Sequence, residues 1–165
     1  MSARFGILDN ILPLVAPVDT AATEKGTPFI DLRKSLRTTV LVYFGVVTAT
    51  SADQNITVTL QAATSAASTS ETAMAFRYRL SGATGANTWG AVTAATTAGV
   101  SLDTTTSDNK MLLIDIDPAA FPAVANDAYF ARVVVTPDAG GTVTLLSAIA
   151  ITDPQYSQVT HQSMT

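Results

Sequence analysis

Hydrophobic and polar residues alternate with a period of two in four segments of the chain. In NITVTLQA, Ile56, Val58 and Leu60 fall on one face and the threonines between them on the other. The other three segments are MAFRYRL (Phe76, Tyr78 and Leu80 against Arg77 and Arg79), MLLIDID (Leu112, Ile114 and Ile116 against Asp115 and Asp117) and TVTLLSAIAI (Val143, Leu145, Ile149 and Ile151, with Ser147 interrupting). Because successive side chains of a strand point to opposite faces, this spacing predicts half-buried strands.

Two further stretches, residues 38–47 and 128–136, are apolar on both faces. This pattern is typical of central strands, or of strands whose outer face meets another subunit. Loops rich in Gly, Pro, Ser and Thr separate these segments, and no apolar pattern at helical spacing extends over about twelve residues. The sequence therefore predicts an all-β fold, a β-sandwich or jelly roll of about seven or eight antiparallel strands.

The predicted strands occupy the middle of a chain of 165 residues, a length that suits one domain. Residues 1–37 contain Pro13, Pro17 and Pro28 and are predicted to form an extended N-terminal arm with one short strand or turn. We expect the sandwich to span residues 38–152 and a polar C-terminal tail to span residues 153–165.

Charge and composition narrow the classes of partner. Charged residues make up only 13% of the chain and the net charge is −4, which argues against sequence-independent binding of nucleic acid. The densest apolar run, Val40 to Val47, is far shorter than the roughly 20 residues of a membrane-spanning helix. The chain has no cysteine, hence neither a disulfide nor a thiolate metal site. We therefore expect a protein that binds neither nucleic acid nor membranes.

The residues that could carry chemistry are few. The only histidine, His161, lies in the polar tail, so neither a catalytic triad nor a zinc site is favoured. Asp103, Asp108 and Asn109 lack the spacing of a calcium loop and are expected to make turns with the backbone. We expect no enzymatic activity and no cofactor.

The segment AFRYRLSGATGANTWGAV combines two arginines with a glycine-rich loop and the only tryptophan. It has no lysine after the glycines and leads into an alternating pattern, so it predicts a β–β connection rather than a phosphate loop. We expect Trp89 to pack at the base of this loop. Arg77 and Arg79 are expected on the outward face, paired across strands with acidic residues such as Asp115 and Asp117.

A basic cluster, DLRKSLR, places Arg33, Lys34 and Arg37 at the boundary between arm and sandwich. These three residues are a third of all basic residues in the chain. The cluster is either a solvated turn or an electrostatic contact with an acidic partner surface, and both interpretations remain open.

The order of several segments resembles a known family. An N-terminal arm leads to GTPFIDL, followed by ITVTLQAATSA, AFRYRLSGATGANTWGAV, DNKMLLIDIDPA, YFARVVVTP and a closing DPQYSQ. Together they resemble the jelly-roll cement, or decoration, proteins of tailed bacteriophages. The resemblance implies a non-enzymatic protein, made in the host cytoplasm and located in the virion. It would bind the outer face of the capsid, bridge neighbouring major capsid proteins, and associate as a homodimer or homotrimer.

Apolar residues of the arm are the candidates for docking onto the capsid or a sister subunit, or else form a strap over the chain's own core: Phe5, Ile7, Leu8, Ile11 and Leu12. Two other functions stay open. One is a phage tail-tube, neck or fibre-associated role, since such proteins share this composition. The other is a carbohydrate-binding β-sandwich that stacks sugars on aromatic residues, the candidates being Trp89, Tyr43, Tyr78 and Tyr129.

Overall fold

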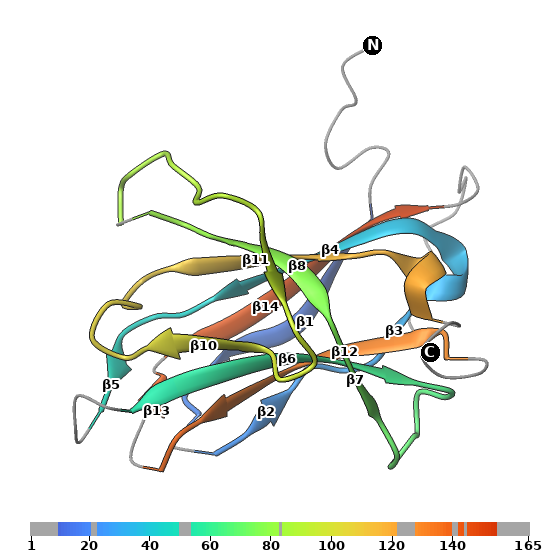
Figure 1. Cartoon of the computed structure of the whole chain (residues 1–165), viewed down its shortest axis with the longest axis horizontal. Coiled ribbons are helices and arrows are strands. Elements are labelled where there is room, and N and C mark those ends of the chain that lie inside the picture. Colours follow the sequence, from blue (N-terminus) through green and yellow to red (C-terminus); the bar gives the residue numbers. More distant parts are fainter. Residues whose placement is uncertain are drawn as a thin grey trace.

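The chain is an all-β protein built from two antiparallel sheets that face each other (Figure 1). The computed structural model describes residues 10–20, 23–49, 54–82, 84–121, 128–139, 142–143 and 145–154. This architecture confirms the predicted β-sandwich, with more strands than the seven or eight expected, because several short strands flank the long ones.

The larger sheet, called sheet A here, has six strands. In spatial order they are β1 (Asn10–Val18), β14 (Leu146–Pro154), β4 (Ser35–Tyr43), β11 (Met111–Ile116), β8 (Phe76–Leu80) and β9 (Thr93–Ala95). The apolar stretch at residues 38–47 thus supplies most of β4, which is hydrogen-bonded on both sides as a central strand.

The second sheet, sheet B, has the order β10 (Val100–Asp103), β6 (Asn55–Ala63), β12 (Phe130–Pro137) and β2 (Lys25–Gly26). Two short strands extend it, since β3 (Ile30–Asp31) pairs with β12 and β7 (Thr72–Met74) pairs with β6. A separate ribbon joins β5 (Val47–Thr48) to β13 (Thr142–Val143). Two 3₁₀ turns are η1 (Leu32–Lys34) and η2 (Pro118–Ala120), each begun by an aspartate whose side chain accepts from a backbone N–H of the turn.

The strands pair in a nested order along the chain. β4 pairs with β14, β6 with β12, and β8 with β11, so an early strand meets a late one at each step. The chain therefore behaves as one long hairpin folded over itself, with its successive pairs placed alternately in the two sheets.

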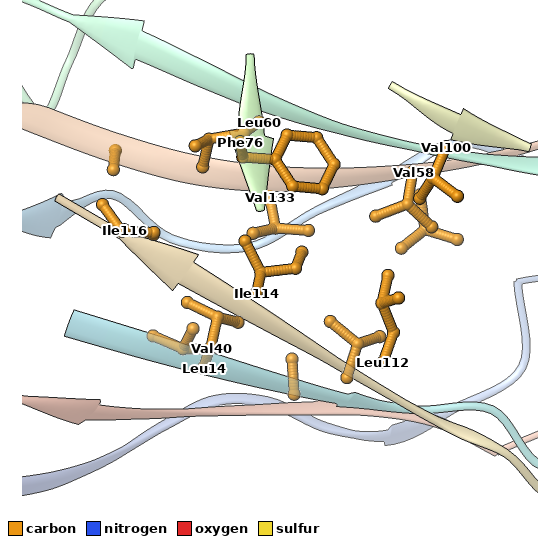
Figure 2. Close-up of a cluster of buried hydrophobic side chains, with 14 of the residues drawn as sticks. Leu14, Val40, Val58, Leu60, Phe76, Val100, Leu112, Ile114, Ile116 and Val133 are labelled. Carbon is orange, nitrogen blue, oxygen red and sulfur yellow. The ribbon is translucent and has the colours of Figure 1, made fainter. Parts of the chain in front are cut away.

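The core lies between the sheets and is formed by the inward residues of each strand (Figure 2). Sheet A contributes, among others, Val40, Leu112, Ile114 and Ile116, and sheet B contributes Val58, Leu60, Val100 and Val133. The alternation predicted for β6 and β11 is confirmed, because the predicted inward residues are buried while the residues between them are half-exposed.

Strand β14 turns toward the core the face opposite to the one that the sequence pattern predicted. In β14 the buried residues are Leu146, Ala148, Ala150 and Thr152. Ile149 and Ile151, which the pattern groups on one apolar face, point out of the sandwich. Small alanines suit the interior here because the core is already filled by the larger side chains of neighbouring strands.

The described part of the expected arm belongs to the sandwich. Strand β1 pairs with β14 over most of its length, from Asn10 opposite Thr152 to Val18 opposite Leu146. Leu14 of this strand is part of the core. Similarly, Asp153 and Pro154 of the expected tail are the last residues of β14.

Candidate functional site

The outward side of sheet A carries two rows of side chains that run across the strands. Directly paired residues of neighbouring strands share a face, so the pairing register defines each row. The first row is Pro13, Ile149, Leu41, Leu113 and Arg79, from β1 to β8. The second row is Ile11, Ile151, Thr39, Asp115 and Arg77 on the same strands. Both rows are aliphatic at the β1 end and charged at the β8 end.

We call the aliphatic part of these rows the outer apolar face, defined by Ile11, Pro13, Leu41, Leu113, Ile149 and Ile151. All six residues retain contact with solvent, and Ile11 is 45% exposed. The main contacts of the sheet A strands are with their in-plane neighbours, and β4 also contacts η1 and η2.

The outward side of sheet B is polar by contrast. Rows there contain Thr57 between Ser101 and Thr136, and Gln61 opposite Arg132. The outer face of an antiparallel sheet is normally solvated and polar in this way. Sheet A departs from that rule, which is the main asymmetry of the sandwich.

The charged end of sheet A contains one satisfied ion pair. The Arg37 guanidinium holds the Asp115 carboxylate through two hydrogen bonds, Nε to Oδ1 at 3.0 Å and Nη2 to Oδ2 at 2.9 Å. These bonds lower the pKa of Asp115 below its usual value, against a smaller opposing effect of burial. Arg77 lies directly opposite Asp115 across the strands, as expected, and its charge helps to lower the pKa of that carboxyl. The close ion pair of Asp115 is nevertheless formed with Arg37, which the sequence did not predict.

Asp117 and Arg79 do not form the other expected pair. The Asp117 side chain accepts from the Ala119 backbone N–H at the start of η2, and Arg79 lies opposite Leu113. Among the described residues, Arg77 and Arg79 form no ion pair, whereas Arg33, Arg37 and Arg132 each hold a carboxylate.

A hollow of about 330 Å³ adjoins this charged end. Its lining combines residues of three strands with two apolar residues of the β8–β9 connection, namely Arg37, Thr39, Arg77, Tyr78, Arg79, Trp89, Val92, Leu113 and Asp115. Trp89 is held there by a bridge to Ser81 at the end of β8, and its side chain is 38% exposed. Trp89 thus lies at the base of the loop, where it also lines the hollow.

The candidate residues of the arm fall in different places. Phe5, Ile7 and Leu8 lie outside the described residues. Ile11 belongs to the outer apolar face, and Leu12 packs against the core. These two neighbours alternate as β1 requires, so Ile11 faces outward and Leu12 faces the core.

The basic cluster divides between the two sheets. Arg33 binds Asp31 through two hydrogen bonds and lies over the Phe130 ring of sheet B, at 5.0 Å from the ring centroid. Arg37 instead binds Asp115 on sheet A, and Lys34 is exposed in η1. Two of the three charges are therefore already compensated within the chain.

Of the acidic loop residues, Asp103 makes a local turn, as expected, whereas Asp108 binds the backbone of β5, 61 residues away in the chain. Asp103 accepts from the backbone N–H and hydroxyl of Thr105, and Asp108 accepts from the Val47 backbone N–H at 2.7 Å. Within the residues that the structure describes, no group of three His, Cys, Asp or Glu side chains could hold a metal ion. His161 lies outside that part of the chain.

Sequence reasoning missed the rows of sheet A because they depend on pairing register. The one available signal was the apolar character of both faces of residues 38–47, which predicts either burial or contact with another subunit. The outward isoleucines of β14 gave no such signal, because alternation alone does not say which face is inside.

Comparisons with known proteins add no information about the fold or the site. No protein-family model matches the chain, and neither a curated protein nor a solved structure gives a significant match. The described residues include no helix that is long and apolar enough to span a membrane.

Proposed function

We propose that this chain is a non-enzymatic structural protein that acts as a cement protein of a phage head. In this role it binds the outer surface of the capsid, bridges neighbouring major capsid proteins and associates with copies of itself. The observation that carries the proposal is the outer apolar face of sheet A, which places six aliphatic residues where the outer face of an antiparallel sheet is normally polar.

The size of this face decides what else a contact with protein needs. Each outward residue covers about 4.8 Å by about 7 Å of the sheet, so the six residues give a flat area of about 200 Å². A standard interface buries about 800 Å² on each partner. The face is therefore too small for a stable interface by itself and needs the adjoining charged end to complete one.

The nested strand pairing supports the resemblance to jelly-roll cement proteins. Pairing β4 with β14, β6 with β12 and β8 with β11 is the scheme of a rolled hairpin, as a jelly roll has. Such a rigid sandwich can present a flat face to an assembled shell without rearrangement of its backbone.

The test uses size-exclusion chromatography with light scattering on the purified chain, alone and after mixing with expanded heads that lack it. We expect a discrete dimer or trimer that co-elutes with the heads at fixed stoichiometry. Ile149→Lys, which places a charge in the outer apolar face, should abolish co-elution. Thr57→Lys places the same charge on the outer face of sheet B and should leave it intact.

Two results would contradict the proposal. Small oligomers that ignore the heads would remove the cement role, and equal binding by both lysine variants would remove the outer apolar face as its site. Rings or tubes formed by the chain alone would favour the tail-tube or neck role.

A further inference from the structure

The two outward arginines of β8 have no close carboxylate of their own, although the charge of Arg77 helps to lower the pKa of Asp115 opposite it. Among the described residues, Arg77 and Arg79 form no ion pair. The only carboxylate among the residues that line their hollow, that of Asp115, is already held by both hydrogen bonds of Arg37. Three positive and one negative side chain line the hollow, which leaves it with a net charge of +2 in a chain of net charge −4.

The hollow combines these charges with apolar surface. Residues two apart on one strand face are about 7 Å apart, so the two guanidiniums can hold one carboxylate from both sides or two neighbouring ones. Trp89, Val92 and Leu113 line the same hollow and offer contact for an aliphatic side chain. Leu113 also begins the apolar row that continues through Leu41 and Ile149.

We infer that this hollow binds an extended acidic segment of the partner protein, with its carboxylates on Arg77 and Arg79 and its aliphatic side chains on Trp89 and Leu113. This inference rests on the proposed function and names the chemistry of the partner: glutamate or aspartate alternating with aliphatic residues. An acidic sugar would satisfy the arginines and Trp89 as well. The continuous aliphatic row beside the hollow favours a peptide, because it offers no hydrogen bonds to sugar hydroxyls.

Trp89 is the only tryptophan of the chain, so its fluorescence reports on this hollow alone. The probe is a blocked peptide of alternating valine and glutamate, compared with the same peptide carrying glutamine. We expect saturable change of Trp89 emission with the glutamate peptide and about tenfold weaker binding of the glutamine peptide. Raising the salt concentration from about 0.05 to about 0.3 M should weaken binding of the glutamate peptide and leave binding of the glutamine peptide unchanged.

Two matched double variants each remove two positive charges, one pair inside the hollow and one pair outside it. Arg77→Gln with Arg79→Gln should abolish the salt-sensitive binding, while Lys25→Gln with Lys34→Gln, which gives the same net charge, should leave it unchanged. Circular dichroism melting of both variants checks that the fold is retained. On heads, the arginine variant should bind at least about tenfold more weakly than the lysine variant.

Each contrary result overturns the inference by a different route. Equal binding of the two peptides, or full binding by the arginine variant, would show that the charges do not recognise the ligand. Binding of a uronic-acid oligosaccharide without binding of the glutamate peptide would assign the hollow to carbohydrate. Head binding that persists in the arginine variant would overturn the inference alone, whereas failure of the unaltered chain to bind heads would instead overturn the proposed function.

Discussion

Neighbouring residues of β11 should separate stability from binding, because one points into the core and the next points out. Ile114 is fully buried between Val40 and Tyr78 of the flanking strands. Leu113 lies on the outer apolar face between Leu41 and Arg79. The variants Ile114→Ala and Leu113→Ala remove aliphatic groups of similar size from the two sides of the same strand.

The expected magnitudes follow from burial. Ile114→Ala leaves a cavity between the sheets and should lower the free energy of unfolding by about 2–5 kcal/mol. Leu113→Ala leaves no enclosed cavity, and since full burial of a leucine is worth about 1.5–3 kcal/mol, its half-buried side chain should account for about 1 kcal/mol. The two variants should therefore differ by about 1–4 kcal/mol, and only Leu113→Ala should weaken binding to heads, by about tenfold.

Urea unfolding followed by far-ultraviolet circular dichroism measures the difference in free energy of unfolding. The slope of that free energy against urea concentration should be the same for both variants. Co-sedimentation with heads, at a temperature where both variants are folded, measures the difference in binding. Equal destabilisation by the two variants would mean that the outer apolar face is part of a core. Equal loss of binding would mean that stability, not contact, governs association.

Three further predictions concern single positions. Gly99 has a φ of +84°, and a side chain there would overlap the Val58 carbonyl oxygen. Gly85 has a similar φ of +80° but open space around it. Gly99→Ala should therefore lower the free energy of unfolding in urea by at least about 1 kcal/mol more than Gly85→Ala does. Thr38 is buried and its hydroxyl has no partner among the described residues, so Thr38→Val should raise the unfolding free energy by about 1 kcal/mol. Because Arg37 lowers the pKa of Asp115 from 3.8, their pair stabilises the fold above about pH 4 and loses its effect as pH falls through the lowered pKa. Since both groups contact solvent, Arg37→Gln should cost under about 1 kcal/mol at pH 7 and nothing near pH 2, measured by urea unfolding at each pH.

The sequence predicted the fold class because alternation is a local property. Ile56 and Ile114 each lie two residues from another apolar side chain on the same strand face, and both are buried as that spacing requires. The short strands such as β2 and β5 were missed because two paired residues leave no periodic signal.

The site was less predictable because it depends on which strands become neighbours. Arg37 and Asp115 are 78 residues apart, and only the pairing of β4 with β11 brings them together. The orientation of β14 likewise depends on core volume, since Ala150 is inside and Ile149 outside although isoleucine is the more hydrophobic residue. Local patterns thus specify strands, whereas the outer apolar face arises from their arrangement.

The edges of sheet A indicate how a partner can approach it. A partner that extends a sheet needs a free row of backbone N–H and C=O groups along an edge strand. Edge strand β1 contains Pro13 and Pro17, which have no N–H to donate, and the opposite edge strand β9 has only three residues. Both edges therefore disfavour strand addition, while the outer apolar face between them contacts solvent in the part of the chain that the structure describes. This combination favours a partner that docks flat on sheet A and is recognised by side chains. Substitutions on that face should consequently change binding far more than replacement of Pro17, which lies outside it.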